Sequence, residues 1–226
     1  MEFEYEIRRS EKRRKLTITV ERDRSVVVHA PVEVSDEKIR EVVDAKRFWI
    51  FEKLHHVQKY TPPPPPGKEL VNGEAALYLG RSYRIEVVDA VTQEIRFDHR
   101  FIIPKSYISR RKAVLRDWYR ERAKEVILPR VRRFAARLGV DFKHARIVDN
   151  RYRWGSCTVK DNVNFNWRLI KAPMFVIDYV IIHELAHLLE SNHTPRFWNI
   201  ISAQTPTMEK ARAWLRENGQ ILEEDI

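Results

Sequence analysis

The residues of this chain best suited to chemistry lie in one short stretch, HELAHLLESNHTPRFW, which covers residues 183–198. His183 and His187 are four residues apart, so on a helix their imidazoles share one face and lie one turn apart. Glu184 is rotated by about 100° from His183 around such a helix, which places its carboxylate beside that face. The pattern H-E-x-x-H is typical of helices that bind a metal ion through both histidines.

A catalytic zinc site usually takes three protein ligands and leaves one position for water, so two histidines are not enough. His193 follows His187 by six residues, and the Ser-Asn pair before it favours a turn that would end the helix. We therefore predict that His183, His187 and His193 bind one ion. The spacing equals that of the metzincin pattern H-E-x-x-H-x-x-G-x-x-H, but Glu190 stands where that pattern has glycine. Spacing alone therefore does not place the chain among the metzincins.

Three neutral imidazoles suit zinc, although nickel, cobalt or iron would bind the same ligands. The alternative is a buried helix whose histidines bond to the backbone. It would have to place two histidines and a glutamate in the apolar run VIIHELAHLL, where unpaired polar groups are costly. A zinc ion in this position lowers the pKa of water and polarises the scissile group, while Glu184 takes the proton and passes it to the leaving group. We expect a metal-dependent hydrolase.

The composition predicts a folded protein of the cytoplasm. The chain has 226 residues, of which 43% are hydrophobic and 11% aromatic, enough for a core without disulfides. Cys157 is the single cysteine, which excludes an internal disulfide and a four-cysteine zinc site. The N-terminal MEFEYEIRRS lacks the apolar region of a secretory signal. The run FVIDYVIIHELAHLL is too short and too charged to span a membrane, so we expect no membrane partner.

The net charge of +10 suggests an anionic partner without identifying one. Basic residues gather in RRSEKRRK, residues 8–15, and in residues 109–139. Nucleic acid, nucleotides or acidic protein surfaces would be attracted, whereas the alternative is a solvated helix surface that keeps the protein in solution. The sequence contains no base-reading motif and no aromatic stacking platform.

The first sixty residues predict a small sheet and a helix. Residues 3–30 alternate between apolar and polar, and KLTITVER and SVVVHA are expected to be strands. Residues 34–60 change to helical spacing, with Ser35 as N-cap. The run TPPPPPG, residues 61–67, favours an extended polyproline segment and is interpreted as a stiff spacer. The predicted domains are an N-terminal subdomain at 1–60, the spacer at 61–67 and a catalytic core at 68–226.

The predicted fold class is α+β, with the H-E-x-x-H helix inside the core. ALYLGRSYRIEVVDA and EIRFDHRFIIP are expected to form strands. A long helix should run from about Tyr107 to Leu138, kinked or split at Pro129 and stopped by Gly139. ARIVDNRYRWGSCTVKDNVNFNWRLI predicts two strands around the turn KDN, ahead of the helix APMFVIDYVIIHELAHLLES. Two more helices, TPRFWNIISAQ and TPTMEKARAWLRENG, begin at Thr-Pro pairs, and Gly219 is expected to end the second.

Residues 151–198, RYRWGSCTVKDNVNFNWRLIKAPMFVIDYVIIHELAHLLESNHTPRFW, resemble the signature of the YgjP-like metallopeptidase family, which is more distantly related to the SprT-like and WLM zinc proteases. The resemblance is looser over the rest of the chain, where it includes VHAP and KRFWI. It implies a zincin-like core and strands at residues 153–157 and 164–168 that lead into the active-site helix. It also implies four site residues: the ligands His183, His187 and His193, and the catalytic carboxylate Glu184.

Other residues near the motif have two interpretations each. Arg153 is suited to bind a substrate carboxylate or phosphate or to stabilise an oxyanion, and equally to form a structural salt bridge under the helix. Tyr179 lies one turn before His183, where it either packs or donates to an oxyanion. Cys157 is expected to be a small buried residue and not a ligand. Three tryptophans are expected to belong to the core and not to a substrate platform: Trp154, Trp167 and Trp198.

Three functions remain open at this point. The first is a zinc-dependent metallopeptidase-like hydrolase that acts on peptides. The second is a metal-dependent hydrolase of a nucleotide or another phosphorylated small molecule, which Arg153 and the basic surplus favour. The third is a nucleic-acid-associated protease, suggested by the arginine-rich helix, whose binding to nucleic acid would fall steeply with salt.

Overall fold

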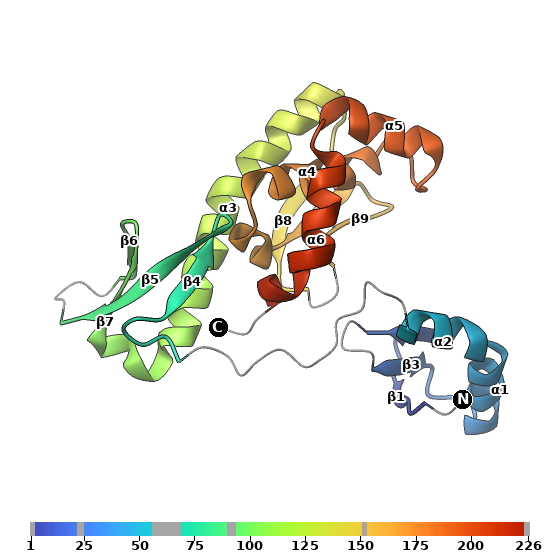
Figure 1. Ribbon diagram of the computed structural model, residues 1–226. Coiled ribbons are helices and arrows are strands. Elements are labelled where there is room, and N and C mark those ends of the chain that lie inside the picture. The colour runs from blue at the N-terminus through green and yellow to red at the C-terminus, as the bar shows by residue number, and fades with distance from the viewer. Residues whose placement is uncertain (1–2, 22–24, 56–68, 90–93, 151–152, 224–226) are drawn as a thin grey trace. The chain divides into compact units, whose positions relative to one another are not determined.

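The structure is a computed structural model that describes residues 3–21, 25–55, 69–89, 94–150 and 153–223. The chain forms two compact units, Met1–Pro63 and Pro64–Ile226, and each has its own hydrophobic core. Both units combine helices with strands, so the predicted α+β class is confirmed (Figure 1). The predicted proline spacer at residues 61–67 lies outside the described residues.

The first unit is a three-stranded sheet with two helices. The strands pair in the order β1-β3-β2, with β3 parallel to β1 and antiparallel to β2. Val28, Ile39 and Ile50 are fully buried in its core. The hydroxyl of Ser35 accepts a hydrogen bond from the backbone of Lys38, as expected of an N-cap. The elements are β1 Glu6–Arg9, β2 Thr17–Val20, β3 Val26–Ala30, α1 Asp36–Ala45 and α2 Arg47–His55.

The prediction of one continuous helix over residues 34–60 was wrong, because the described part contains two helices that meet at Lys46. Lys46 leaves helical geometry, with φ −100° and ψ 6°, and its N–H bonds to the carbonyls of Val42 and Val43. The apolar stripe is therefore interrupted, and Phe48 is 70% exposed. A break at one residue leaves no mark on a periodicity that is averaged over a window.

The second unit contains a four-stranded sheet that is attached to the core through a tight turn. The strands are β4 Ala75–Tyr78, β5 Arg81–Val88, β6 Arg96–Phe97 and β7 Phe101–Pro104, in the order β4-β5-β7-β6. Gly80, between β4 and β5, has φ +79°, and a Cβ there would lie 2.6 Å from the Pro173 ring. Its N–H donates to the carbonyl of Lys171 at 2.8 Å. Only glycine allows the turn to approach this closely.

The long helix α3 (Arg111–Leu138) is continuous through Pro129, so of the predicted kink or split, the split was wrong. Pro129 is exposed within the helix, and the first part of the predicted span is a 3-10 helix, η1 (Lys105–Arg110). Packing of one face of α3 against the core holds the helix together despite the hydrogen bond that proline cannot donate. The predicted stop at Gly139 is confirmed, because this residue is left-handed with φ 67°.

A second three-stranded sheet leads into the helix that carries the motif. Its strands are β8 His144–Val148, β9 Gly155–Cys157 and β10 Asn162–Asn166, in the order β8-β10-β9. The antiparallel pair β9 and β10 confirms the two strands predicted around KDN. The strand implied at residues 164–168 ends at Asn166, because Arg168 belongs to the 3-10 helix η2 (Trp167–Lys171), which precedes α4 (Met174–Ala186).

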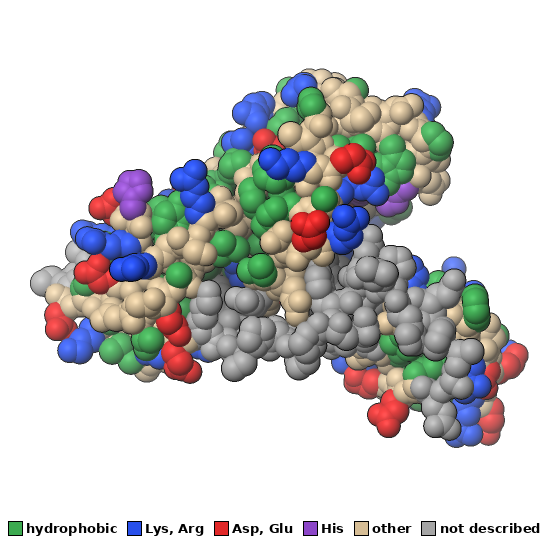
Figure 2. Space-filling view, in the orientation of Figure 1, with side chains coloured by type: hydrophobic (Ala, Val, Ile, Leu, Met, Phe, Trp, Pro, Cys, Tyr) green, Lys and Arg blue, Asp and Glu red, His purple; other side chains and the backbone are tan. Residues whose placement is uncertain are grey.

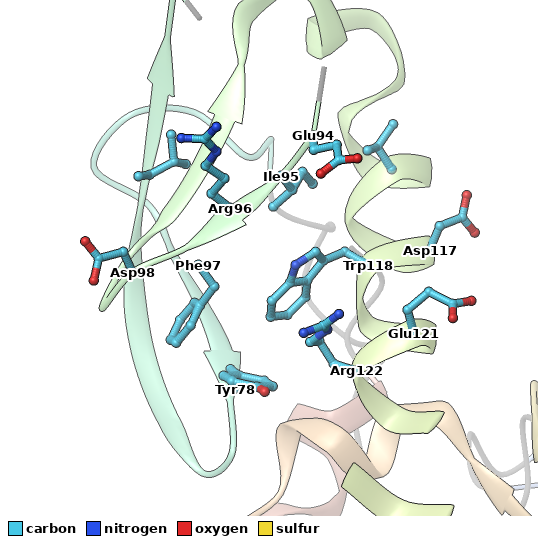
Figure 3. Close-up of a pocket in the computed structure, with 12 residues that line it drawn as sticks. Tyr78, Glu94, Ile95, Arg96, Phe97, Asp98, Asp117, Trp118, Glu121 and Arg122 are labelled. Atoms are coloured by element: carbon cyan, nitrogen blue, oxygen red, sulfur yellow. The ribbon is translucent and has the colours of Figure 1, made fainter. Parts of the chain in front are cut away.

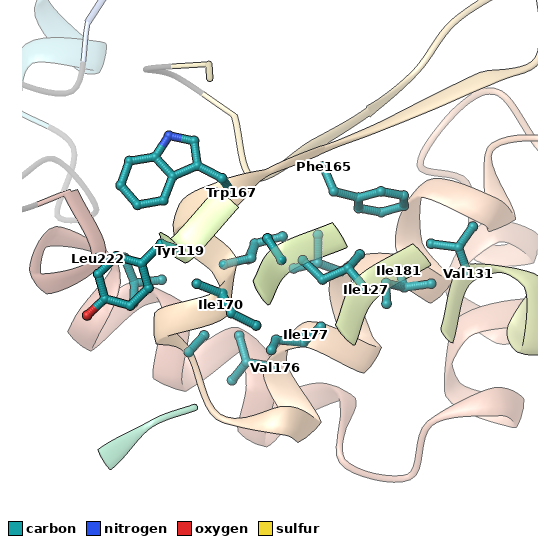
Figure 4. Close-up of a cluster of buried hydrophobic side chains, with 14 of the residues drawn as sticks. Tyr119, Ile127, Val131, Phe165, Trp167, Ile170, Val176, Ile177, Ile181 and Leu222 are labelled. Atoms are coloured by element: carbon teal, nitrogen blue, oxygen red, sulfur yellow. The ribbon is translucent and has the colours of Figure 1, made fainter. Parts of the chain in front are cut away.

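Helix α4 is the centre of the larger core. It is apolar on all sides, as expected of a helix that is covered all around. Figure 4 shows Ile177 and Ile181 of α4 beside Ile127 of α3. Asp178, the charge in this apolar run, accepts a hydrogen bond from Arg130 Nε of α3 at 2.7 Å. Core packing and this hydrogen bond thus hold the part of α4 that precedes His183 in place.

Two further helices, α5 (Pro195–Gln204) and α6 (Met208–Glu223), complete the second unit. Thr194 caps α5 by accepting from the N–H of Phe197, as predicted. The predicted end of the last helix at Gly219 was wrong, because Gly219 is buried inside α6. A glycine ends a helix when it adopts positive φ, and Gly219 is not among the described glycines that do so.

Five of the ten basic residues of α3 form ion pairs with described residues. Lys and Arg side chains are mixed with Asp and Glu on the face shown in Figure 2. This pairing reduces the positive charge that α3 offers to an anionic partner. The pairs are Arg111–Glu69, Arg120–Asp149, Arg122–Glu125, Lys124–Glu121 and Arg130–Asp178.

None of the described helices has the length and apolar character needed to cross a membrane.

Candidate active site

The three predicted ligands come together at the end of α4. His183 lies in the last turn of the helix, His187 is its C-cap, and His193 lies in the segment before α5. One ring nitrogen from each lies within 4.8 Å of the others. Nε2 of His183 and Nε2 of His193 are 3.2 Å apart. Among the described residues, these three form the one group of potential ligands close enough to hold a metal ion.

The donor set suits a divalent metal ion such as zinc. At metal–nitrogen distances of about 2.0–2.1 Å, two nitrogens of a tetrahedral site lie about 3.3 Å apart, close to the distance between His183 and His193. Burial lowers the pKa of His183 to about 3 and also lowers the pKa of His187. Both imidazoles are therefore neutral, which is the form that binds metals.

Glu184 is a buried carboxyl that faces β9. Its side chain is so close to Gly155 that a Cβ there would lie 2.5 Å from Glu184 Cγ and 2.7 Å from Oε1. Burial raises the pKa of Glu184 to about 7, against the opposing effects of the Arg153 charge and a hydrogen bond from the Cys157 backbone. A carboxyl with a pKa near neutrality is suited to accept and release a proton.

These residues line one cleft of about 430 Å³. Arg153 belongs to it as well, and its charge acts on Glu184. Val159, in the turn between β9 and β10, is fully exposed at the cleft. The lining residues are Arg153, Gly155, Ser156, Cys157, Thr158, Val159, His183, Glu184, His187, Ser191 and His193.

A larger cavity of about 820 Å³ lies between β6, β7 and α3, away from the histidines. Figure 3 shows Tyr78, Phe97 and Trp118 on its aromatic side, with Asp117 and Glu121 on the helix. None of the described residues that line it is a histidine or a cysteine. Volume alone therefore does not make it the reactive site, and we assign chemistry to the smaller cleft.

The structure places the remaining candidates as follows. Cys157 is half-buried beside the cleft, burial raises the pKa of its thiol, and its sulfur is not part of the ligand group. Burial raises the pKa of Tyr179 to about 12, and its ring lies 5.9 Å from that of His183. Trp167 is buried in the core as predicted, and Trp154 packs partly against it. Trp198 packs on the core and also stacks on His193.

The sequence analysis missed the contacts made by Gly155, Phe197 and Trp198. A glycine within a strand indicates that another group approaches the backbone closely. Gly155 is such a glycine, so the sequence did contain a signal for its contact with Glu184. The ring contacts of Phe197 and Trp198 had no such signal, since they depend on how α5 packs against the end of α4.

A histidine triad that could hold a metal ion shares one cleft with a buried glutamate, a combination of residues that suits a metal-dependent hydrolase. The family model described as "YgjP-like, metallopeptidase domain" matches residues 14–218, so the chain belongs to the YgjP-like metallopeptidase family. This membership identifies a hydrolase of the metal-dependent peptidase class, and the matched range reaches into both compact units. No curated protein and no solved structure matches the chain.

Proposed function

We propose that this protein is a zinc-dependent peptidase with a zincin-like core, in which His183, His187 and His193 hold the metal and Glu184 is the general base. The observation that carries the proposal is the meeting of three ligand nitrogens within 4.8 Å and a buried carboxyl in one cleft. When bound, zinc supplies a Lewis acid that polarises the scissile carbonyl and acidifies water.

Glu184 then has two tasks. It accepts the proton of the attacking water and delivers that proton to the leaving amine. Its position supports this role, because the Cys157 backbone bonds to the carboxylate while Gly155 allows its close approach. A carboxylate held in this way needs little rearrangement before the proton transfer.

The open edge of β9 is suited to an extended peptide. β9 lies at the edge of its sheet, and bonds to β10 use the carbonyl of Trp154 and the N–H of Thr158. Alternation along the strand turns the backbone groups of Gly155 and Cys157 away from β10. The N–H of Cys157 bonds to Glu184, so a peptide would pair with the groups of Gly155 and the carbonyl of Cys157. A peptide that pairs with this edge would lie along the cleft. Arg153, at the start of the same segment, is placed to bind a substrate carboxylate or a developing oxyanion.

The test is a substrate panel with full-length, zinc-loaded protein. Denatured proteins and peptides are incubated in parallel with nucleoside triphosphates, and both peptide cleavage and phosphate release are measured. We expect peptide cleavage that stops on chelation and falls by about 10²–10⁴-fold in Glu184→Gln. Because Glu184 is not a ligand, that variant should still bind zinc. Release of phosphate or pyrophosphate without peptide cleavage would replace this proposal with the nucleotide hydrolase.

A further inference from the structure

Two aromatic side chains of α5 contact the imidazoles of the triad. The Phe197 ring is fully buried, and its centroid lies 5.0 Å from that of His183, 4.5 Å from His187 and 4.7 Å from His193. Trp198 stacks on His193 with centroids 5.5 Å apart and planes at 21°. All of these separations are within the range of favourable ring packing.

Hydrogen bonds do not orient all three imidazoles. A metal-binding histidine usually donates its second ring N–H to a carbonyl or carboxylate, which fixes the ring. Nδ1 of His187 has the carbonyl of Glu190 at 3.3 Å. Nδ1 of His183 is buried and has no hydrogen-bond partner among the described residues. The His183 ring therefore relies on other contacts for its orientation.

The local sequence explains why these rings come so close. His193 is followed at once by Thr194, the N-cap of α5, and by Pro195 in its first turn. The cap fixes where the helix starts, so Phe197 and Trp198 lie in the first turn, immediately after the third ligand. The segment that carries His193 therefore continues directly into the helix whose side chains contact His193.

A residue of α6 contacts the ring of Trp198. The guanidinium of Arg212 lies 4.7 Å from the centroid of the Trp198 ring, a cation–π distance. Glu209, one turn earlier, accepts a hydrogen bond from Arg212 at 3.0 Å. The Arg212 guanidinium and the His193 imidazole thus both contact the indole of Trp198.

We propose that Phe197 and Trp198 are positioning residues that orient the three imidazoles for metal binding, and that Arg212 supports Trp198 in this role. The inference rests on the proposed metal site. It predicts that the affinity for zinc depends on a flat ring at position 198, although Trp198 is not a ligand.

The experiment measures zinc affinity of the full chain by competition with a chromophoric chelator, and records the visible spectrum of the cobalt(II) form, which reports coordination geometry. Trp198→Leu should lower zinc affinity by about 10–100-fold, the usual effect of losing a group that orients a ligand, and should alter the cobalt spectrum. Trp198→Phe keeps a flat ring and should restore most of the affinity. Trp214→Leu is the matched control, because Trp214 is a half-buried tryptophan of α6 that packs on the same core.

The outcomes separate this inference from the proposed function. If the wild-type protein binds no zinc, the proposed function itself fails. If the wild type binds zinc and Trp198→Leu binds it as well as Trp214→Leu does, the positioning role is contradicted. If circular dichroism shows that Trp198→Leu is unfolded, the zinc affinity of Arg212→Lys is measured in its place. Arg212 is exposed, and lysine keeps the charge but lacks the planar guanidinium. A loss of zinc affinity in Arg212→Lys that is smaller than about 10–100-fold supports the inference, and an unchanged affinity overturns it.

Discussion

The carboxyl of Glu184 is held in place by the backbone of β9. Gly155 leaves no room for a side chain, and the Cys157 backbone bonds to the carboxylate. The ligand nitrogens lie on other residues of the cleft. Metal binding and proton transfer can therefore be disturbed separately, which gives each its own test.

Gly155→Ala should reduce peptide cleavage while zinc binding stays as in the wild type. The added Cβ would lie 2.5 Å from Glu184 Cγ, so the carboxyl must move. A displacement of about 1 Å at a reacting group can cost about 10²-fold in rate. Turnover of a peptide and zinc content are measured side by side, with Ser156→Ala as the neighbouring control. Full activity in Gly155→Ala would show that Glu184 is not the base.

The sequence could predict the histidine triad but not the side chains that surround it. His183 and His187 meet because helical spacing is fixed, and His193 joins them because polar residues end the helix. The ring contacts of Phe197 and Trp198 depend on the direction in which α5 leaves its cap. That direction is set by tertiary packing, which local patterns do not contain.

Among the elements, α3 carries an unfavourable residue that the fold tolerates. Pro129 lies exposed in a helix of 28 residues, where it cannot donate the hydrogen bond of its turn. Pro129→Ala should raise the free energy of unfolding by up to about 3 kcal/mol. Denaturant titration measures the effect, with Arg132→Ala on the exposed side of α3 expected to change stability by less than about 0.5 kcal/mol. Equal or lower stability of Pro129→Ala would mean that proline suits the local geometry of α3.

Element type was more predictable than element ends. The strands beside KDN, the N-caps Ser35 and Thr194 and the stop at Gly139 follow from local chemistry and are confirmed. The break at Lys46 and the continuation of α6 past Gly219 do not. Both depend on which side chains find a core, which neither periodicity nor the preference of helix ends for glycine reveals.

For the whole molecule, the two cores predict two unfolding transitions. Units with separate cores need not unfold together. Zinc should stabilise only the unit that contains the triad, by about 2.7 kcal/mol when free zinc is 100 times its dissociation constant. Calorimetry with and without zinc measures both transitions. A single transition that moves as a whole with zinc would show instead that the units are tightly coupled.

The central claim is that three imidazoles hold one catalytic ion, and metal content tests it most directly. The full-length protein and its His193→Ala variant are equilibrated with zinc, freed of unbound metal and assayed for bound zinc by elemental analysis. The account predicts one zinc per wild-type chain and a large loss in His193→Ala, because a site with two remaining imidazoles binds weakly. Wild-type protein without zinc, or a variant that keeps all of it, would contradict the account.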